Sequence, residues 1–403
     1  MSRQYVRPRL ETLEDRCVPA NLYWAGAADG NWSVAGNWKY DNGMVAVAAP
    51  TAMDVVYLDN TSNTNSKQDI VNLTVAGLHT TSAFTSTVTL ANTLKVAGDG
   101  WIEAGTFSGA GSLRFINGSS TQVLFGGTFN AAVWFGDTGV RPTVTFDNAS
   151  DVVFAGGVEN WGSMQRAQSG TVKFDSTFNN RWSYEDIYGS GTAGTGTINN
   201  TGTFKASVGS GTSTVSVNFT NASGGQVQAL SGLLKFTGTF LQDGAGTSTT
   251  MNGGNIQATS TFRLNGGTFS GTGTFTGDLN NQKGSVIPGL GGSAGGVAGT
   301  LTISGTYLQS GDGTLVINID NANVSKLVVT STINLDGELK VNRNNGFTPA
   351  QGNDFIFLTY NGTGSTGWFD IFTLPNNSWA NGGTRWFLPD YDDTLGEAWL
   401  HVM

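Results

Sequence analysis

A short unit, glycine followed by threonine and a hydrophobic residue, recurs along this sequence and limits the folds that it can adopt. Several of its spacings lie in the twenties and thirties, a period typical of solenoids, in which each repeat forms one coil stacked on the next. We expect glycine to turn a corner, threonine to begin a strand and the hydrophobic side chain to point inward. The unit begins, among other places, at Gly105, Gly127, Gly196, Gly202, Gly238, Gly267, Gly273, Gly299 and Gly305.

Local alternation and composition also favour strands. The segments "TLTIS" (300–304) and "ELKV" (338–341) alternate hydrophobic and polar residues, which is the period-two pattern of a half-buried strand. Glycine fills 58 of 403 positions and charged residues only 12%, about double and about half their usual shares. The 23 phenylalanines and 11 tryptophans exclude a disordered chain, which would be poor in aromatics.

The fold that these patterns predict is all-β: a right-handed parallel β-helix spanning residues 63–345. At about 24 residues per coil this body makes about 12 coils, and at about 4.8 Å per coil it is about 55–60 Å long. Residues 21–62, with Trp24, Trp32 and Trp38, suit a cap over the first coil, because an open strand edge promotes aggregation. Residues 346–403 suit a C-terminal β cap. Tandem β-sandwiches are the alternative.

Charge and residue counts exclude several classes of protein. The net charge of −9 comes without a basic cluster, so no nucleic-acid partner is expected. No run approaches the ~18 apolar residues of a membrane span. Cys17 has no second cysteine to pair with, and His79 and His401 are the two histidines. We therefore expect no disulfide within the chain, no His-rich metal site and no nucleophilic triad.

The first 20 residues differ from the rest and resemble a sorting tag. The segment "RPRLETLEDRCVPA" (7–20) is dense in charge and lacks the apolar core of an ordinary signal peptide. It is similar to the N-terminal tag R-x-R-L-E-x-L-E-D-R-x-x-P-A of large surface proteins in planctomycete-type bacteria. That resemblance implies export and an extracellular or cell-surface location. The matching residues are Arg7, Arg9, Leu10, Glu11, Leu13, Glu14, Asp15, Arg16, Pro19 and Ala20.

The body resembles the β-helical repeats of bacterial surface proteins, including autotransporter passengers. The similarity is strongest over 299–369, and the Trp-rich start from Trp24 to Trp38 is also typical of such proteins. No outer-membrane barrel follows, so we expect attachment through non-covalent contacts or partners rather than self-transport. The residues that fit the family's closing motif are Gly346, Phe347, Thr348, Pro349, Gly352, Phe355 and Leu358.

Two regions could carry binding chemistry. Charge is densest over 141–190, where aromatics lie among carboxylates, a combination that suits a sugar ring; the alternative is a solvated insertion whose aromatics fold onto the rod. No cofactor is expected, although the acids of the tail could hold Ca²⁺ if a turn brought them together; a solvated hairpin turn is the alternative. The candidate glycan-binding residues are Trp161, Trp182, Tyr184 and Tyr188, and the tail acids are Asp390, Asp392, Asp393 and Glu397.

These features together favour an exported, non-enzymatic structural protein of the cell surface or extracellular matrix. A rigid solenoid of this kind would self-associate into a fibre or lattice, or mediate adhesion. Its partners would be other copies, envelope components or extracellular glycans. The alternative is a glycan-binding or polysaccharide-degrading β-helix protein, since such enzymes place grouped carboxylates on one face.

Overall fold

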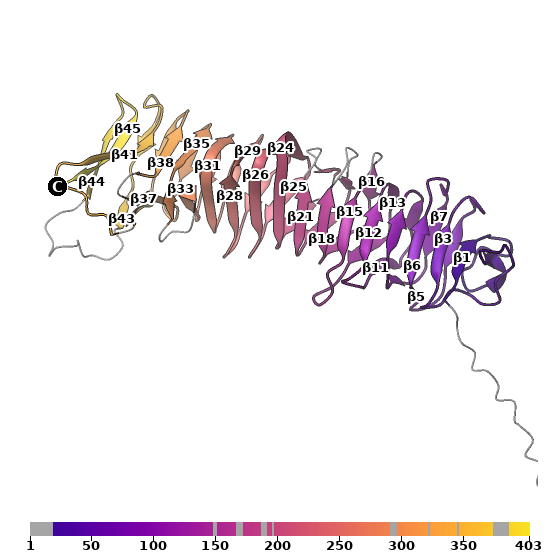
Figure 1. The fold of residues 1–403 in the computed structure, drawn as a ribbon. Helices are drawn as coiled ribbons and strands as arrows, with labels where there is room; N and C mark the ends of the chain where they lie inside the picture. Colours follow the sequence, from indigo (N-terminus) through magenta and orange to yellow (C-terminus); the bar gives the residue numbers. More distant parts are fainter. Residues whose placement is uncertain are drawn as a thin grey trace, which may run out of the picture.

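The computed structural model describes residues 19–147, 151–166, 172–186, 192–195, 197–290, 296–320, 323–344, 346–373 and 387–403. Within these ranges the chain forms one elongated rod of stacked strands (Figure 1). The tag residues from Arg7 to Arg16 and Tyr188 lie outside the described residues. Among the described residues the single helical element is the short 3₁₀ turn η1 (Ala35–Asn37).

Each coil contributes one strand to each of three faces. The first two faces belong to a 31-stranded sheet, and the third is a separate 14-stranded sheet. The first face holds β1 (Asn21–Trp24), β3 (Val55–Leu58), β6 (Gly77–Thr80), β9 (Gly100–Ile102), β12 (Thr121–Leu124), β15 (Thr143–Phe146), β18 (Ser163–Arg166), β21 (Ser183–Asp186), β24 (Thr203–Val215), β26 (Gln226–Phe236), β28 (Ser248–Asn252), β31 (Thr268–Thr276), β33 (Ser285–Leu290), β37 (Thr314–Ile319), β40 (Glu338–Arg343) and β43 (Ile371–Thr373).

The long strands β24, β26 and β31 bend from the first face into the second. The second face otherwise holds β4 (Ser66–Gln68), β7 (Thr87–Leu90), β10 (Thr106–Ser108), β13 (Gly127–Phe129), β16 (Val152–Phe154), β19 (Val172–Phe174), β22 (Thr192–Ala193), β29 (Gly254–Ala258), β35 (Thr300–Ser304), β38 (Lys326–Val329) and β41 (Asp354–Thr359).

The third face holds β5 (Thr74–Val75), β8 (Leu94–Val96), β11 (Ser112–Phe115), β14 (Ala132–Phe135), β17 (Val158–Asn160), β20 (Thr177–Asn180), β23 (Thr197–Asn200), β25 (Asn218–Asn221), β27 (Phe240–Gln242), β30 (Phe262–Leu264), β32 (Leu279–Asn281), β36 (Tyr307–Gln309), β39 (Ile333–Leu335) and β42 (Thr366–Gly367). Outside the three faces lie β2 (Trp38–Lys39), β34 (Val297–Ala298), β44 (Phe387–Asp392) and β45 (Glu397–Val402).

The strands stack in parallel, which confirms the predicted solenoid. β10 pairs in parallel with both β7 and β13, whereas a sandwich would pair neighbouring strands antiparallel, so the sandwich alternative is wrong. From β5 to β39, within the predicted body, the third face has 13 strands and hence 12 steps between coils. Thirteen coils agree with the expected number of about 12, and 12 steps of about 4.8 Å span about 58 Å.

A column of phenylalanines fills the core, and two of its members, Phe107 and Phe129, come from the Gly-Thr-Phe units that predicted an internal ladder. Phe107, Phe129, Phe154 and Phe174 lie in register on successive coils, and their ring centroids are 5.3, 5.0 and 5.6 Å apart. All four are buried. Gly105 precedes its strand with φ +99°, a conformation that glycine adopts without strain. The repeat therefore sets both the corner and the inward side chain.

A second buried column is polar. Asn160, Asn180, Asn200, Asn221 and Gln242 lie in register along the third face. Each amide donates to the next at 2.8, 2.8, 2.8 and 3.3 Å. The asparagines also donate to backbone carbonyl groups of the following coil, at 3.0 Å in the case of Asn160 and Ser183. Burial of these amides is tolerated because their hydrogen bonds are satisfied.

The N-terminal end is covered by three tryptophans. Trp24, Trp32 and Trp38 are fully buried, and Trp38 packs edge-on against each of the other two at 5.1 Å. The Trp32 indole donates to Ser66 Oγ on β4 at 3.0 Å, which ties this segment to the first coil. β1 pairs with β3 in parallel and with β2 antiparallel, so the segment supplies both a cap and the first strand.

The C-terminal end is closed on one face by antiparallel strands. β45 pairs with β41 and with β44. Leu400 and Val402 point into the core and His401 points outward, as the alternation of the last strand predicts. On the other two faces the last strands among the described residues are β42 and β43. The two ends of the rod are therefore covered in different ways.

Candidate functional site

The clearest surface feature of the charge-dense region is the corner between β20 and β21. Arg181 and Trp182 form the turn between these strands. Ser163, Ser183 and Thr203 lie in register on successive coils, so the residues just before them, Gly162, Trp182 and Gly202, occupy the same corner of three coils. Trp182 is thus the one bulky residue of the three, and 42% of it is exposed.

Steric contact between coils explains the flanking glycines. A Cβ atom added to Gly162 would lie 2.2 Å from the carbonyl oxygen of Pro142, and one added to Gly202 would lie 2.2 Å from that of Trp182. Both are backbone clashes that no rotamer change could relieve. The corner therefore lacks side chains on the coils directly before and after Trp182.

Arg141 reaches the indole from two coils away. Its guanidinium carbon lies 3.5 Å from the centroid of the Trp182 ring, a cation–π contact. The strand after Arg141, β15, begins at Thr143, which pairs in register with Ser163. Arg141 therefore lies two coils before Trp182, and its side chain passes over the coil of Gly162 to reach the indole. The contact holds one cationic group beside the indole.

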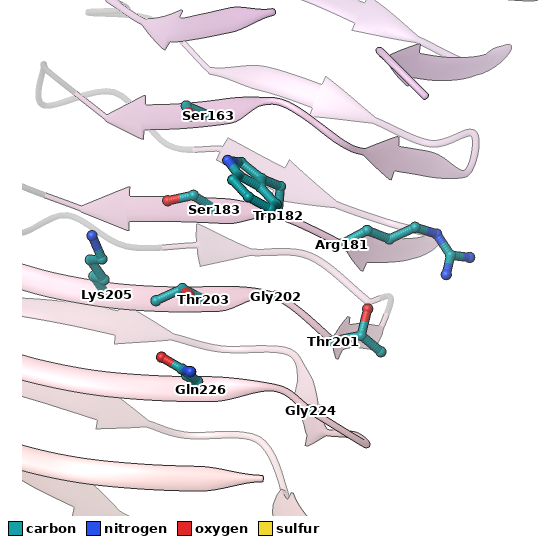
Figure 2. A pocket seen from close by; sticks show the side chains of 10 residues that line it. All are labelled: Ser163, Arg181, Trp182, Ser183, Thr201, Gly202, Thr203, Lys205, Gly224 and Gln226. Carbon is teal, nitrogen blue, oxygen red and sulfur yellow. The ribbon is translucent and has the colours of Figure 1, made fainter. Parts of the chain in front are cut away.

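Trp182 also borders a shallow groove of about 440 Å³. Figure 2 shows the indole standing between the strands that carry Ser163 and Ser183, with Lys205 and Gln226 on the coils that follow. Neither Lys205 nor Arg141 has an ion-pair partner among the described residues, although Glu185 lies in register beside Lys205. The groove is lined by Ser163, Arg181, Trp182, Ser183, Thr201, Gly202, Thr203, Lys205, Gly224 and Gln226.

Trp161 occupies a different environment. It is half-buried, and the guanidinium carbon of Arg181 lies 5.2 Å from its ring centroid. Arg181 also forms an ion pair with Glu159 at 2.5 Å. The indole Nε1 is buried and has no hydrogen-bond partner among the described residues. Trp161 is therefore packed against the rod, as the alternative of folded-down aromatics predicts.

The assignment of Tyr184 to a glycan-binding surface is wrong. The side chain is fully buried and stacks on Phe204 with centroids 4.9 Å apart. It belongs to the core because Ser183 begins β21 and the period-two alternation turns the next residue inward. Tyr188, the fourth candidate, lies outside the described residues.

The carboxylates of the two acidic regions are dispersed. The part of the chain that the structure describes contains no group of three or more Asp, Glu, His or Cys side chains placed to hold a metal ion. In the tail, Asp392 caps the hairpin turn between β44 and β45 by accepting hydrogen bonds from the backbone amides of Thr394 and Leu395 at 2.8 and 3.0 Å. Asp393 accepts a hydrogen bond from the Tyr360 hydroxyl at 2.7 Å. The predicted hairpin turn is present, between β44 and β45.

The two histidines lie on the outer surface of the rod. His401 Nδ1 lies 2.6 Å from Asp354 on β41, and Nε2 lies 3.5 Å from Asp390 on β44. The hydrogen bond to Asp354 raises the pKa of His401. His79 lies within β6, and its ring contacts that of Tyr57 in a tilted arrangement, with centroids 4.8 Å apart. Burial lowers its pKa.

Sequence reasoning identified Trp182 but missed Arg141, Lys205 and the hydroxyl groups around it. A signal was present, since Asn160, Asn180 and Asn200 repeat at intervals of 20 residues. Aligning the chain on these asparagines places Gly162, Trp182 and Gly202 in one column. Arg141 carries no such signal, because its contact crosses two coils.

Comparisons with known proteins found no match to a family model, a curated protein or a solved structure. The fold defines the class: an all-β parallel solenoid with three strands per coil. Among the described residues no helix is long or apolar enough to span a membrane.

Proposed function

We propose that this chain is an exported, non-enzymatic structural protein of the cell surface or extracellular matrix, and that its rods associate end to end with other copies. The observation that carries the proposal is the position of the exposed apolar side chains. Among the described residues, nine of the 14 large hydrophobic residues that are most exposed lie in the two end segments, 21–62 and 346–403. These segments hold about a quarter of the chain.

The N-terminal apolar patch consists of Met44, Val45, Val47 and Met53, which are 62, 57, 87 and 46% exposed. It lies in the loops that extend past β1 at the indigo end of the rod (Figure 1). Exposed apolar side chains in one short segment of the chain, here 44–53, are typical of contact surfaces. Their place beyond the first strand favours a contact along the rod axis.

The C-terminal apolar patch consists of Trp368 and Ile371, which are 68 and 53% exposed. Ile371 begins β43, which is the last strand of the first face in the part of the chain that the structure describes. Solenoids without a polar terminal repeat tend to stack on one another. A second copy that places its N-terminal patch here would cover apolar surface on both partners, and repetition of the contact would give a fibre. Adhesion to another surface remains the alternative use of the same ends.

The test is the oligomeric state of the protein and of charged variants. Val47→Glu and Ile371→Glu should each lower the sedimentation coefficient at high protein concentration, because a carboxylate in the contact would be desolvated. Trp182→Glu is the control, since Trp182 is an exposed apolar residue that lies on the central coils, away from both ends. Sedimentation as a monomer at every concentration, with no ordered assembly by electron microscopy, would refute the proposal.

A further inference from the structure

We infer that the groove beside Trp182 binds an acidic polysaccharide that contains uronic acid residues. This inference does not depend on end-to-end association. It rests on a different surface, the corner of the central coils, and on the chemistry of the groups that meet there.

The indole supplies the apolar part of such a site. A pyranose ring has a face of C–H groups that packs against an aromatic ring, with apolar area removed from water on both sides. Trp182 is 42% exposed and lines the groove. Gly202, which follows it on the next coil, cannot carry a side chain that would cover the ring.

The cationic groups select an acidic ligand. Arg141 lies over the indole without lining the groove, so its guanidinium adds positive charge next to the ring on which a sugar would stack. Its N–H donors lie at the edge of the planar group and match the geometry of a carboxylate. Lys205 lines the same groove. Two cations without ion-pair partners among the described residues stand out in a chain of net charge −9.

The rest of the lining suits the hydroxyl groups of a sugar. Ser163, Ser183, Thr203 and Gln226 border the groove and offer both donors and acceptors. They lie on successive coils of the first face. Successive coils lie about 4.8 Å apart, so a chain of sugars laid along the rod axis would meet hydroxyl groups at each coil.

The experiment measures retention of the purified full-length protein on immobilised polygalacturonate, dextran and poly-glutamate at about 50 mM salt. We expect binding to polygalacturonate alone. Dextran has sugar rings without carboxylates, and poly-glutamate has carboxylates without sugar rings. Equal binding to poly-glutamate would show that charge alone accounts for the binding. Equal binding to dextran would show that the cations do not distinguish acidic from neutral polysaccharides. Either result, or no binding to polygalacturonate, would overturn the inference.

Variants localise the binding to this groove. Trp182→Ala should weaken binding to polygalacturonate about tenfold, equivalent to about 1.4 kcal/mol. Trp134→Ala is the control, because Trp134 also carries an arginine over its ring, Arg114 at 4.3 Å, but does not line the groove. If both variants bind as the parent protein does, the site lies elsewhere and the inference fails.

A second pair of variants keeps the test valid if the alanine variant folds poorly. Arg141→Gln and Lys205→Gln change side chains that are exposed or half-exposed, so thermal unfolding should be nearly unchanged. Each should weaken binding and flatten its dependence on salt concentration, since a screened ionic contact is lost. An unchanged affinity and salt dependence in both variants would contradict the assignment of these cations.

Discussion

At the scale of single residues, the buried asparagine column is the least expected feature of this protein. Asn200 accepts a hydrogen bond from Asn180 at 2.8 Å and donates to Asn221 at 2.8 Å and to the carbonyl oxygen of Gln226 at 3.0 Å. It is fully buried. Because each member both donates and accepts, removal of one leaves neighbours with unmade hydrogen bonds in a low-dielectric interior.

We therefore expect Asn200→Ala to destabilise the protein by about 2–4 kcal/mol, through lost hydrogen bonds and a cavity. The adjacent Asn199 is the matched control, because it lies on the same strand with its side chain on the outer surface. Asn199→Ala should cost less than about 0.5 kcal/mol. Urea unfolding followed by tryptophan fluorescence measures both, and equal midpoints for the two variants would contradict the role of the column.

How well the sequence predicts the position of a side chain depends on how far along the chain its contacts lie. The inward phenylalanines were predicted because their direction follows from alternation within one strand, which the Gly-Thr-Phe unit displays. Tyr184 was misplaced because its tyrosine hydroxyl and charged neighbours suggested an exposed loop, whereas β21 turns it inward. Arg141 was missed because its partner lies 41 positions later, at a distance that only the coil length of about 20 residues explains.

At the scale of elements, the C-terminal strands depend on contacts that the sequence only partly reveals. The alternation of the last strand predicted Leu400 and Val402 as core residues. Its antiparallel pairing with β41 was not predictable, because residues of the closing motif from Gly346 to Leu358 indicate a strand without indicating its partner. The three strands β41, β44 and β45 are joined at the surface by His401, which lies between Asp354 and Asp390.

This cluster predicts a pH-dependent stability of the C-terminal cap. The pKa of folded His401 is raised above its ordinary value of 6.5, so protonation favours the folded state. The stabilisation is fully present below pH about 6.5 and is lost as the pH rises through the raised value. We expect the melting temperature of the parent protein to exceed that of His401→Gln at pH 5.5 and to approach it at pH 8.5.

Thermal scans of both proteins between pH 5.5 and 8.5 measure this difference directly. Asp390→Asn, which removes the more distant of the two carboxylates, should reduce the low-pH advantage without abolishing it. A constant difference between the parent protein and His401→Gln across the range would mean that the charge of His401 does not contribute to the cap.

At the scale of the whole molecule, stability is distributed along one axis. Each coil of a solenoid contacts its neighbours and little else. A destabilising substitution in one coil therefore lowers the stability of distant coils only through the contacts between successive coils. The composition and the repeat sufficed to predict this architecture and the number of coils. The tryptophan-rich segment and the C-terminal β segment were expected to cover the two ends, but the antiparallel pairing of β45 with β41 was not predicted.

The tryptophan cluster offers the sharpest test of this one-dimensional behaviour. Trp38 packs against both Trp24 and Trp32 and donates to the carbonyl oxygen of Trp32 at 3.0 Å. Trp38→Ala should therefore open a cavity in the cap and cost about 3–5 kcal/mol locally. Hydrogen exchange should accelerate in β1, β3 and the next one or two coils, while the amides of β35 to β40 should exchange at unchanged rates. Uniform acceleration along the whole rod would instead show that the protein unfolds as a single cooperative unit, because the loss at one end would then lower the free energy of unfolding of every coil equally.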